Sequence, residues 1–267
     1  MLPAKIAVVV HRDDSGFDSA RYLLKLLMAL WQERGVTIEI VRDVDRPISA
    51  DLVIPHLNLT VVPPDYVEFM SGHPRVVNRH LIDISKSRIS SNILGPDDSY
   101  DGPVIVKTDR NYGGLPEART LGDGATTLDP QNYPIYDSPA DVPADMFSDE
   151  HLVVEKFVPE VDETGYHLRN WTFFGDRGIN KVVRSKERIV KARNIIDREE
   201  VPVPDELRST RADLRVDFAK LDYVINDGKA VLLDVNRTPT YRGPTPSESV
   251  KKLVGVMADG IEGLVDA

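Results

Sequence analysis

The stretch AVLLDVNRTPT, Ala230–Thr240, joins an apolar run typical of a buried strand to two polar residues near its end. Side chains alternate between the two faces of a strand, so Asp234 and Asn236 lie on the same face. Burying a lone carboxylate is unfavourable unless a positive group meets it. The sequence therefore predicts a partner for Asp234, which is either a lysine or a metal ion.

The strand before this stretch, Val216–Ile225, is predicted to form a hairpin with Lys229–Val235. The connection, residues 226–228 (NDG), suits a three-residue loop with glycine in the left-handed position. Counting outward from that loop makes Asp222 and Asp234 diagonal neighbours, roughly 7 Å apart at the backbone. A two-residue loop would instead place the two aspartates on opposite faces.

The predicted register gives the hairpin one apolar face and one polar face. The apolar face carries Leu221, Tyr223, Ile225, Val231, Leu233 and Val235, and the polar face carries Lys220, Asp222, Val224, Leu232, Asp234 and Asn236. Two interpretations of the polar face remain open. In the first, Lys220 pairs with Asp234 and the face meets water. In the second, the face lines a cleft, and Asp222, Asp234 and Asn236 supply the hard oxygen ligands that suit magnesium.

The composition excludes several other classes of protein. The 267 residues carry a net charge of -10, which disfavours a binder of nucleic-acid backbones. The chain has no cysteine, so disulfides, thiolate metal sites and cysteine nucleophiles are excluded. The start of the chain does not resemble a secretory signal, and no apolar run approaches the length of a membrane span. We therefore expect a soluble, cytoplasmic protein with one large domain or two modest ones.

The first 80 residues alternate between strand and helix patterns, which predicts an open parallel α/β unit. We expect strands at Lys5–Val10, Val36–Val41, Asp51–Pro55 and Arg75–Asn78, a helix from the N-cap candidates Asp14 and Ser15 to about Arg34, and a short helix from Pro63.

The pattern changes beyond residue 80. We expect a helix from Asn78 to about Asn92, a strand at Val104–Thr108, mainly loops to Asp149, a strand at Leu152–Val158, a hairpin of Trp171–Phe174 with Lys181–Val183, and a helix at Asp205–Leu214. A capping box at Thr245–Glu248 is expected to open a C-terminal helix.

The run Leu221-Asp222-Tyr223 followed by Leu233–Pro239 (LDVNRTP) resembles the closing metal-binding motif of ATP-grasp enzymes. In that family an aspartate is followed about a dozen residues later by an acidic residue, any residue and an asparagine. Asp222, Asp234 and Asn236 match this spacing, although the usual acid in the second position is glutamate. The resemblance implies that these three residues bind the metal.

Other segments follow the order of the same family and carry the roles that the resemblance implies. The implied nucleotide contacts are Lys86 on a helix, Lys107 on a strand, the loop glycines Gly113 and Gly114, the inter-lobe residues Glu155, Lys156, Phe157 and Val158, and Glu160 at the ribose. The implied catalytic arginines are Arg169, Arg184 and Arg193. Each of these residues alone also has an ordinary interpretation: the lysines as surface residues, the glycines as a turn, and Arg184 and Arg193 as part of a solvated charged run.

The resemblance implies a mixed α/β fold. A parallel α/β domain, residues 1–80, would precede an ATP-grasp domain of two α+β lobes, residues 81–267. One lobe would be trimmed, because only a short segment separates Lys86 from Lys107.

The implied activity is that of a ligase that uses ATP and Mg²⁺, or Mn²⁺, to convert a carboxylate into an acyl phosphate for attack by an amine. The acceptor would enter between the loop His11–Gly16 and the arginines. The implied partners are these small molecules, with neither nucleic acid nor membrane, and a homodimer is expected by analogy. A small-molecule kinase and a non-catalytic nucleotide-binding protein are the alternatives.

Overall fold

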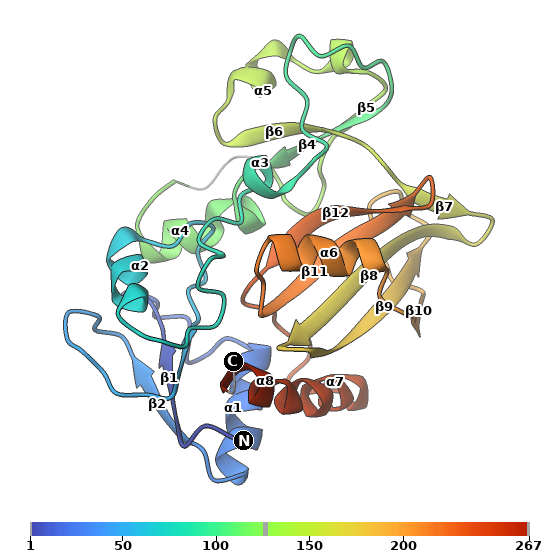
Figure 1. Ribbon diagram of the computed structural model, residues 1–267. Helices are drawn as coiled ribbons and strands as arrows, with labels where there is room; N and C mark the ends of the chain where they lie inside the picture. Colours follow the sequence, from blue (N-terminus) through green and yellow to red (C-terminus); the bar gives the residue numbers. More distant parts are fainter. Residues whose placement is uncertain (1, 125–127, 266–267) are drawn as a thin grey trace.

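The computed structural model describes residues 2–124 and 128–265, and its strands form three sheets (Figure 1). A parallel sheet in the order β2-β1-β3 lies near the N-terminus, a small antiparallel sheet has the order β5-β4-β6, and a larger antiparallel sheet has the order β10-β9-β8-β11-β12, with β7 paired to β8. This mixture of parallel and antiparallel sheets confirms the expected α/β fold class.

The N-terminal sheet is built from the apolar runs that the sequence indicates. Strand β1 (Lys5–Val9) lies between β2 (Thr37–Val41) and β3 (Leu52–Pro55) and is buried along almost its whole length. Helix α1 (Leu23–Glu33) ends just before Gly35, whose φ of 89° suits glycine alone, and α2 (Pro64–Ser71) begins with a proline in its first turn.

Three expectations for the first 92 residues are wrong. Helix α1 begins at Leu23, not near Asp14, because residues 11–22 form turns and Tyr22 makes a strand-like bridge to Thr240. The strand expected at Arg75–Asn78 is reduced to a single bridge between Val53 and Val76. The helix expected from Asn78 to Asn92 is only one turn, α3 (Lys86–Ile89). Asn78 has a φ of 56°, and its side chain bonds to the backbone of Asp217 and Phe218, which turns the chain away from a helical path.

The small antiparallel sheet contains β4 (Val104–Thr108), β5 (Ile135–Tyr136) and β6 (Leu152–Lys156). The segment between β4 and β6 has more regular structure than expected: η1 (Asn111–Gly114), α4 (Leu115–Thr120), η2 (Pro139–Asp141) and α5 (Ala144–Ser148). The residues numbered 125–127 in this segment lie outside the described part of the chain. The short helices were missed because each is only one or two turns long.

The larger sheet holds β7 (Glu160–Asp162), β8 (Gly165–Phe174), β9 (Arg177–Ser185), β10 (Asp197–Glu200), β11 (Phe218–Asn226) and β12 (Lys229–Asn236). Strands β8 and β9 are longer than expected, and β7 and β10 were not expected. All four residues of β10 are exposed and charged, so this edge strand has no apolar alternation that could indicate it. Helix α6 (Asp205–Asp213) contributes Leu207 to the core that includes Trp171, Leu221 and Tyr223.

The loop of the β11–β12 hairpin has two residues, because Asn226 pairs with Lys229. The three-residue loop expected from the sequence is therefore wrong. Asp227 and Gly228 have φ values of 49° and 76°, as a tight hairpin turn with two left-handed residues requires.

A β-bulge at Leu233 nevertheless keeps the two aspartates on one face. Tyr223 pairs with Leu232, and Asp222 pairs directly with Asp234, so Leu233 is the extra residue between the two pairs. Without the bulge, Asp234 would lie opposite Leu221 on the apolar face. Compared with our expectation, Leu232 and Leu233 exchange faces: Leu232 joins the core, and Leu233 lines a cavity.

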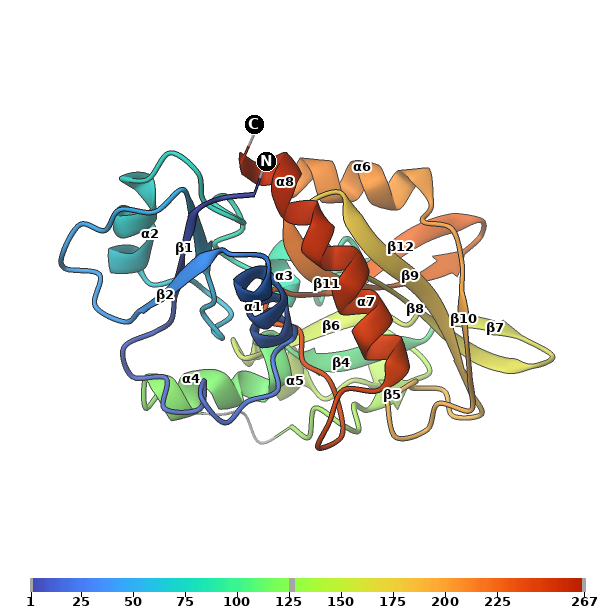
Figure 2. The same ribbon diagram turned by 90° about the horizontal axis from the view of Figure 1, so that it is seen from below.

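The C-terminal helices pack against the N-terminal unit. Helix α7 (Glu248–Ala258) is followed by η3 (Asp259–Ile261) and α8 (Glu262–Val265), and Figure 2 shows α7 crossing the larger sheet beside α1. Trp31 of α1 is fully buried and donates its indole N–H to the carbonyl of Ala258 at 2.9 Å. The expected capping box is wrong, because Ser247 is the N-cap and makes no side-chain capping bond.

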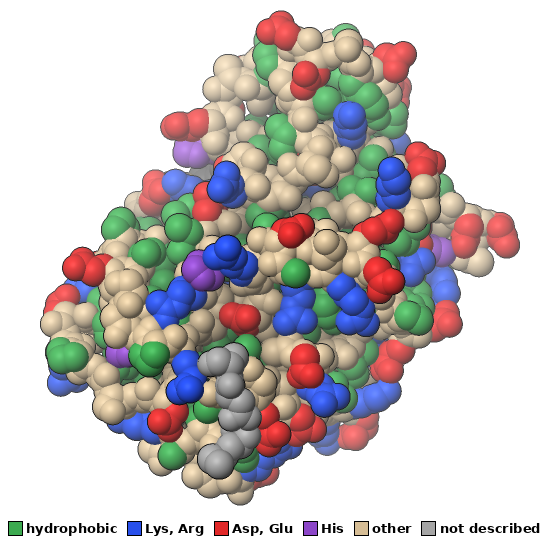
Figure 3. All heavy atoms as spheres, viewed as in Figure 1, with side chains coloured by type: hydrophobic (Ala, Val, Ile, Leu, Met, Phe, Trp, Pro, Cys, Tyr) green, Lys and Arg blue, Asp and Glu red, His purple; other side chains and the backbone are tan. Residues whose placement is uncertain are grey.

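The face seen in Figure 3 mixes positive and negative side chains. None of the helices in the described ranges is both long enough and apolar enough to cross a membrane.

Candidate functional site

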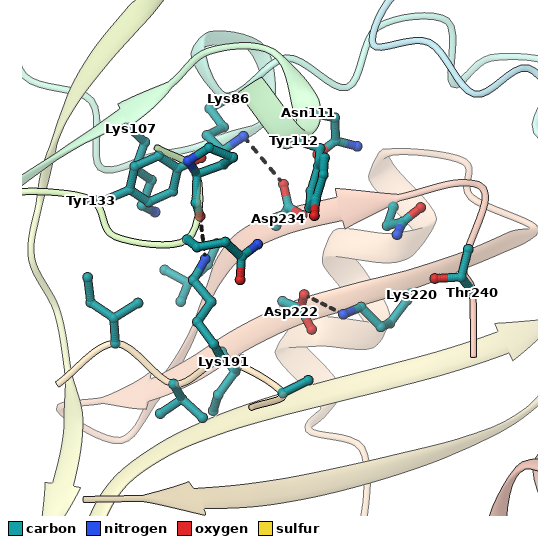
Figure 4. A pocket seen from close by; sticks show the side chains of 18 of the residues that line it. Lys86, Lys107, Asn111, Tyr112, Tyr133, Lys191, Lys220, Asp222, Asp234 and Thr240 are labelled. Atoms are coloured by element: carbon teal, nitrogen blue, oxygen red, sulfur yellow. Dashed lines mark hydrogen bonds and ion pairs between the residues drawn. The ribbon is translucent and has the colours of Figure 1, made fainter. Parts of the chain in front are cut away.

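A cavity of about 910 Å³ lies where the three sheets and their loops meet. Its walls come from the loop before α1, strands β4 and β6, the loop after β9, and the polar face of β11 and β12. The cavity is lined by nine of the twelve predicted metal and nucleotide residues: Lys86, Lys107, Lys156, Phe157, Val158, Glu160, Asp222, Asp234 and Asn236. Figure 4 shows Lys86 directed at Asp234 and Lys220 directed at Asp222.

Each of the two aspartates forms an ion pair with a lysine and also has one oxygen without a hydrogen bond. Lys220 Nζ lies 2.8 Å from Asp222 Oδ2, and Lys86 Nζ lies 3.7 Å from Asp234 Oδ1. Within the described ranges, the buried atoms Asp222 Oδ1 and Asp234 Oδ1 accept no hydrogen bond. Leaving a buried acceptor unsatisfied is costly, so these oxygens are suited to a ligand that supplies positive charge.

The electrostatics of the pair agree with this geometry. Burial raises the pKa of Asp222, and the neighbouring Asp234 adds to that effect, while Lys220 opposes it. Burial disfavours the Lys220 ammonium, but Asp222 and Asp234 more than offset it and hold the pKa of Lys220 above its usual value. Lysine therefore only partly satisfies the acids. The first interpretation is wrong, because Lys220 pairs with Asp222 and the polar face lines a cavity, and metal binding stays a prediction.

The donor set fits a hard divalent cation. Two carboxylates that face each other and one amide oxygen are the ligand types that Mg²⁺ takes, with water or phosphate completing its shell. Asn236 Oδ1 already accepts the backbone N–H of Thr238 at 2.9 Å, but an amide oxygen has a second lone pair. Among the described residues there is no cluster of three or more His, Cys, Asp and Glu side chains with metal-binding geometry, so an all-protein cage is not offered.

Two further lysines extend the positive wall beyond the hairpin. Lys107 Nζ lies 2.5 Å from Glu155 Oε2, and Glu155 is almost completely buried. Lys191 donates to the carbonyl of Pro130 at 3.0 Å and lies over the ring of Tyr133. Burial lowers the pKa of Lys191, and the other charges that act on it are Asp234, Lys107, Asp222 and Lys86. The four lysines thus share one electrostatic environment with the acids.

The predicted glycine pair lies in a left-handed run beside the cavity. Tyr112, Gly113 and Gly114 have φ values of 50°, 70° and 73°. The two glycines are buried and do not line the cavity, whereas their neighbours Asn111 and Tyr112 do. The glycines therefore set the backbone path that brings Asn111 and Tyr112 to the cavity.

The predicted inter-lobe segment, residues 155–158, also reaches the cavity. Lys156 donates its backbone N–H to Asn92, and Phe157 donates to Pro103, at 2.9 and 2.8 Å. Arg188 stacks over the Phe157 ring at 5.1 Å, which places an apolar and cationic surface at this end. Glu155 points to Lys107, not into open space.

Glu160 and Arg169 are held by each other. Arg169 donates three hydrogen bonds to the Glu160 carboxylate at 2.7–3.0 Å, and the backbone N–H of Ile225 adds a fourth at 2.7 Å. These bonds connect three strands, because Glu160 lies on β7, Arg169 on β8 and Ile225 on β11. Glu160 lines the cavity, and Arg169 does not.

The structure also leaves Arg184 and Arg193 outside the cavity lining. Arg184 pairs with Asp197 and Glu199 across the β9–β10 ladder, and Arg193 is exposed and donates to the carbonyl of Gln131. The same loop instead places Arg188 and Lys191 in the wall. Sequence reasoning missed these two residues because the run RSKERIVKAR carries five basic residues, and only the path of the loop decides which of them turn inward.

Solved structures resemble this chain over nearly its whole length. PsnB, described as an ATP-grasp ligase complexed with a minimal precursor, gives a TM-score of 0.55 at 14% identity and covers 99% of both chains. The chain has the ATP-grasp fold. A D-alanine–D-alanine ligase from Bacillus anthracis complexed with ATP gives 0.53 at 14% identity, covering 98% of this chain and 96% of the ligase. A RimK domain protein ATP-grasp from Sphaerobacter thermophilus gives 0.51 at 14% identity, covering 97% and 100%.

The ATP-grasp fold confirms the resemblance that the closing motif and the ordered lysines indicated. No protein-family model and no curated protein matches the chain by sequence. The similarity to solved structures therefore shows the fold, and the chemistry depends on the residues of the cavity.

Proposed function

We propose that this protein is an ATP-dependent ligase that activates a carboxylate as an acyl phosphate for attack by an amine. The observation that carries the proposal is the wall formed by Asp222 and Asp234: two facing carboxylates, each with a buried oxygen that accepts no hydrogen bond from any described residue, surrounded by lysines. Carboxylate oxygens that lack a hydrogen-bond donor, beside lysines that suit phosphate, favour a divalent cation that Asp222 and Asp234 would hold.

The nucleotide occupies the cavity between the two antiparallel sheets. Phe157 and Val158 border its base, and Lys86, Lys107 and Lys191 offset the charge of its phosphates. Asp222, Asp234 and Asn236 would hold Mg²⁺, with Mn²⁺ as the alternative, and the metal would neutralise phosphate charge when bound. This arrangement leaves the loop before α1 free to receive the second substrate.

The reaction needs no nucleophile from the protein. A carboxylate oxygen of the substrate attacks the γ-phosphorus while the bond from that phosphorus to the β,γ-bridging oxygen breaks, which gives an acyl phosphate and ADP. The amine then attacks the acyl carbon, phosphate leaves with the electron pair of the C–O bond, and the nitrogen loses a proton to water. Positioning and charge stabilisation by the lysines supply the catalysis.

Calorimetry and trapping together test the proposal. We expect ATP to bind with Mg²⁺ and to lose affinity when EDTA removes the metal, and we expect ADP and a hydroxamate when hydroxylamine is added with a pool of small carboxylates. A stable phosphoester would instead indicate a small-molecule kinase. Binding of ATP without release of ADP in any acceptor pool would indicate a non-catalytic nucleotide-binding protein.

A further inference from the structure

Thr60 lies on the loop between β3 and α2, does not line the cavity, and is 1% exposed. Its backbone N–H donates to Glu117 Oε1 at 2.6 Å, and its hydroxyl accepts the backbone N–H of Asn111 at 2.9 Å. Its carbonyl accepts the backbone N–H of Ile84 at 3.0 Å and an N–H of the Arg237 guanidinium. Thr60 therefore joins four segments that lie far from one another in the sequence.

Each of these segments continues directly into the cavity wall. Asn111 opens η1 and lines the cavity itself. Ile84 precedes Lys86 by two residues, and helix α4, which follows η1, contributes several lining residues. Arg237 comes directly after Asn236, one of the predicted metal ligands. A residue outside the cavity thus connects the walls on which the proposed nucleotide contacts lie.

Arg237 is a buried arginine whose guanidinium joins backbone segments. It is 4% exposed and donates to the carbonyls of Leu81, Leu59 and Thr60. Two buried atoms of the cluster, Arg237 Nε and Glu117 Oε2, have no hydrogen-bond partner among the described residues. A buried polar network stabilises the fold most when every member is satisfied, so this network is arranged for position and not for stability alone.

The hydroxyl of Thr60 is the side-chain contact that holds the start of η1. The side chain of Asn111 also donates to the carbonyl of Val235 at 3.4 Å, next to Asp234 on β12. Figure 4 shows Asn111 and Tyr112 at the cavity together with Asp234. Tyr112 has a φ of 50°, a left-handed conformation that is unfavourable for a residue with a side chain. Because such a conformation persists only when its surroundings hold it, the bond between Asn111 and Thr60 is placed to keep Tyr112 at the cavity.

We propose that Thr60 is a positioning residue for the nucleotide. Through its hydroxyl it holds η1 against the end of β12, so that Asn111 and Tyr112 meet the phosphate end of a bound nucleotide. Thr60 touches neither nucleotide nor metal and acts through the backbone of Asn111. The proposal rests on the ligase function proposed above and adds to it a residue that lies outside the cavity.

Two substitutions of Thr60 isolate the hydroxyl. Thr60→Val removes it with little change in shape and keeps the backbone bonds to Glu117 and Ile84. We expect the affinity for MgATP to fall by about tenfold, as when a group that orients a ligand-binding residue is lost. Calorimetry measures the affinity at a temperature where urea unfolding shows the variant to be folded. Thr60→Ser keeps the hydroxyl and should bind MgATP as the wild type does.

A control and a second measurement separate positioning from stability. Thr210→Val removes a hydroxyl bond to the carbonyl of Glu206 on α6, away from the cavity lining, and should leave MgATP affinity unchanged. Hydrogen exchange over residues 111–114 follows η1 directly. In the wild type we expect MgATP to slow this exchange, and in Thr60→Val we expect the segment to exchange faster than in the wild type or in Thr60→Ser.

The outcomes distinguish this proposal from the function on which it rests. If folded Thr60→Val binds MgATP as tightly as the wild type, the positioning role is wrong and the proposed ligase site stands. An equal loss of affinity in Thr60→Ser would also overturn the role, because the hydroxyl would then not be the group that matters. Exchange over residues 111–114 that MgATP leaves unchanged in the wild type contradicts the role without any variant. If MgATP does not bind the wild type, the proposed function fails and the positioning role fails with it.

Discussion

The cavity wall on β11 and β12 and the core between α1 and α7 both bury side chains, but they bury opposite chemistry. In the core, Leu24, Leu27 and Trp31 pack with Met257, and the one polar indole N–H has its acceptor. In the wall, Asp222 and Asp234 retain oxygens without donors. The core gains stability from complete packing, whereas the wall keeps its acids incompletely satisfied and so keeps them available to a ligand.

We expect the largest effect on turnover from removing the charge of either acid in the cavity wall. We expect Asp222→Asn and Asp234→Asn to lower turnover by a hundredfold to a thousandfold, about 2.7–4 kcal/mol, because each removes charge where phosphate and metal meet. ADP release at saturating MgATP measures the effect. Asp227→Asn, in the exposed hairpin turn, removes the same charge away from the cavity and should leave turnover unchanged. Normal turnover in either acid variant would contradict the metal assignment.

Truncation in the core should act on stability and not on binding. Leu27 is fully buried, so we expect Leu27→Ala to lower the free energy of unfolding by about 3 kcal/mol through lost burial and a residual cavity. Urea unfolding measures this change, and calorimetry at a temperature where the variant is folded should show wild-type affinity for MgATP. Leu121→Ala, at a half-exposed position, is the control and should change stability little. An equal loss in both variants would show that the core is not close-packed.

A buried histidine beside the core allows a further test of how burial acts on a polar side chain. His56 is completely buried between Phe17 and Tyr22, and burial lowers its pKa to about 3. The unfolded chain therefore takes up a proton below pH 6.5 that the folded chain refuses until about pH 3, so stability falls as the pH falls through this window.

We expect the His56 contribution to lower the free energy of unfolding by about 2 kcal/mol between pH 7 and pH 5. His56→Leu should remove this part of the acid sensitivity, as measured by urea unfolding at the two pH values, with the carboxylate contributions common to both proteins. His80→Gln, at an exposed histidine, should retain it. Identical pH dependence in His56→Leu and the wild type would mean that His56 is not kept neutral by burial.

We expect the smallest effect at Lys191, which lies on the loop after β9 and lines the same cavity. We expect Lys191→Met to weaken MgATP binding by about tenfold, or 1.4 kcal/mol, because one of several phosphate-facing charges is lost. Lys186→Met, on the same loop but outside the cavity lining, should bind normally. Calorimetry that fails to separate the two variants would remove Lys191 from the phosphate site.

The sequence predicted the elements whose apolar periodicity is strong and missed those that depend on contacts far along the chain. Strands β1, β4 and β6 follow uninterrupted apolar runs and were predicted nearly to their ends. The one-turn helix at Lys86 could not be predicted, because the preceding path depends on Asn78 and its bonds to Asp217 and Phe218, more than 130 residues away.

The hairpin shows how two residues can share a face as predicted although the predicted loop length is wrong. The spacing of Asp222 and Asp234 placed them together, but the loop was assigned three residues instead of two. A three-residue turn would pair Asp222 with Leu232, whereas the two-residue turn with the Leu233 bulge pairs Asp222 with Asp234. The two registers differ by two residues, so both leave the aspartates on one face, and alternation alone cannot distinguish them. Arg169 likewise has the residue type of a phosphate ligand, yet only the fold shows that Glu160 occupies its guanidinium.

The placement of Trp31 has a practical consequence for studying this chain. The protein has two tryptophans, and Trp31 and Trp171 lie in different apolar clusters. Replacing either by phenylalanine leaves a single emitter whose fluorescence reports on the apolar cluster around it. Coincident denaturation curves from the two proteins would mean that the two apolar clusters melt as one cooperative unit, whereas separated curves would reveal two.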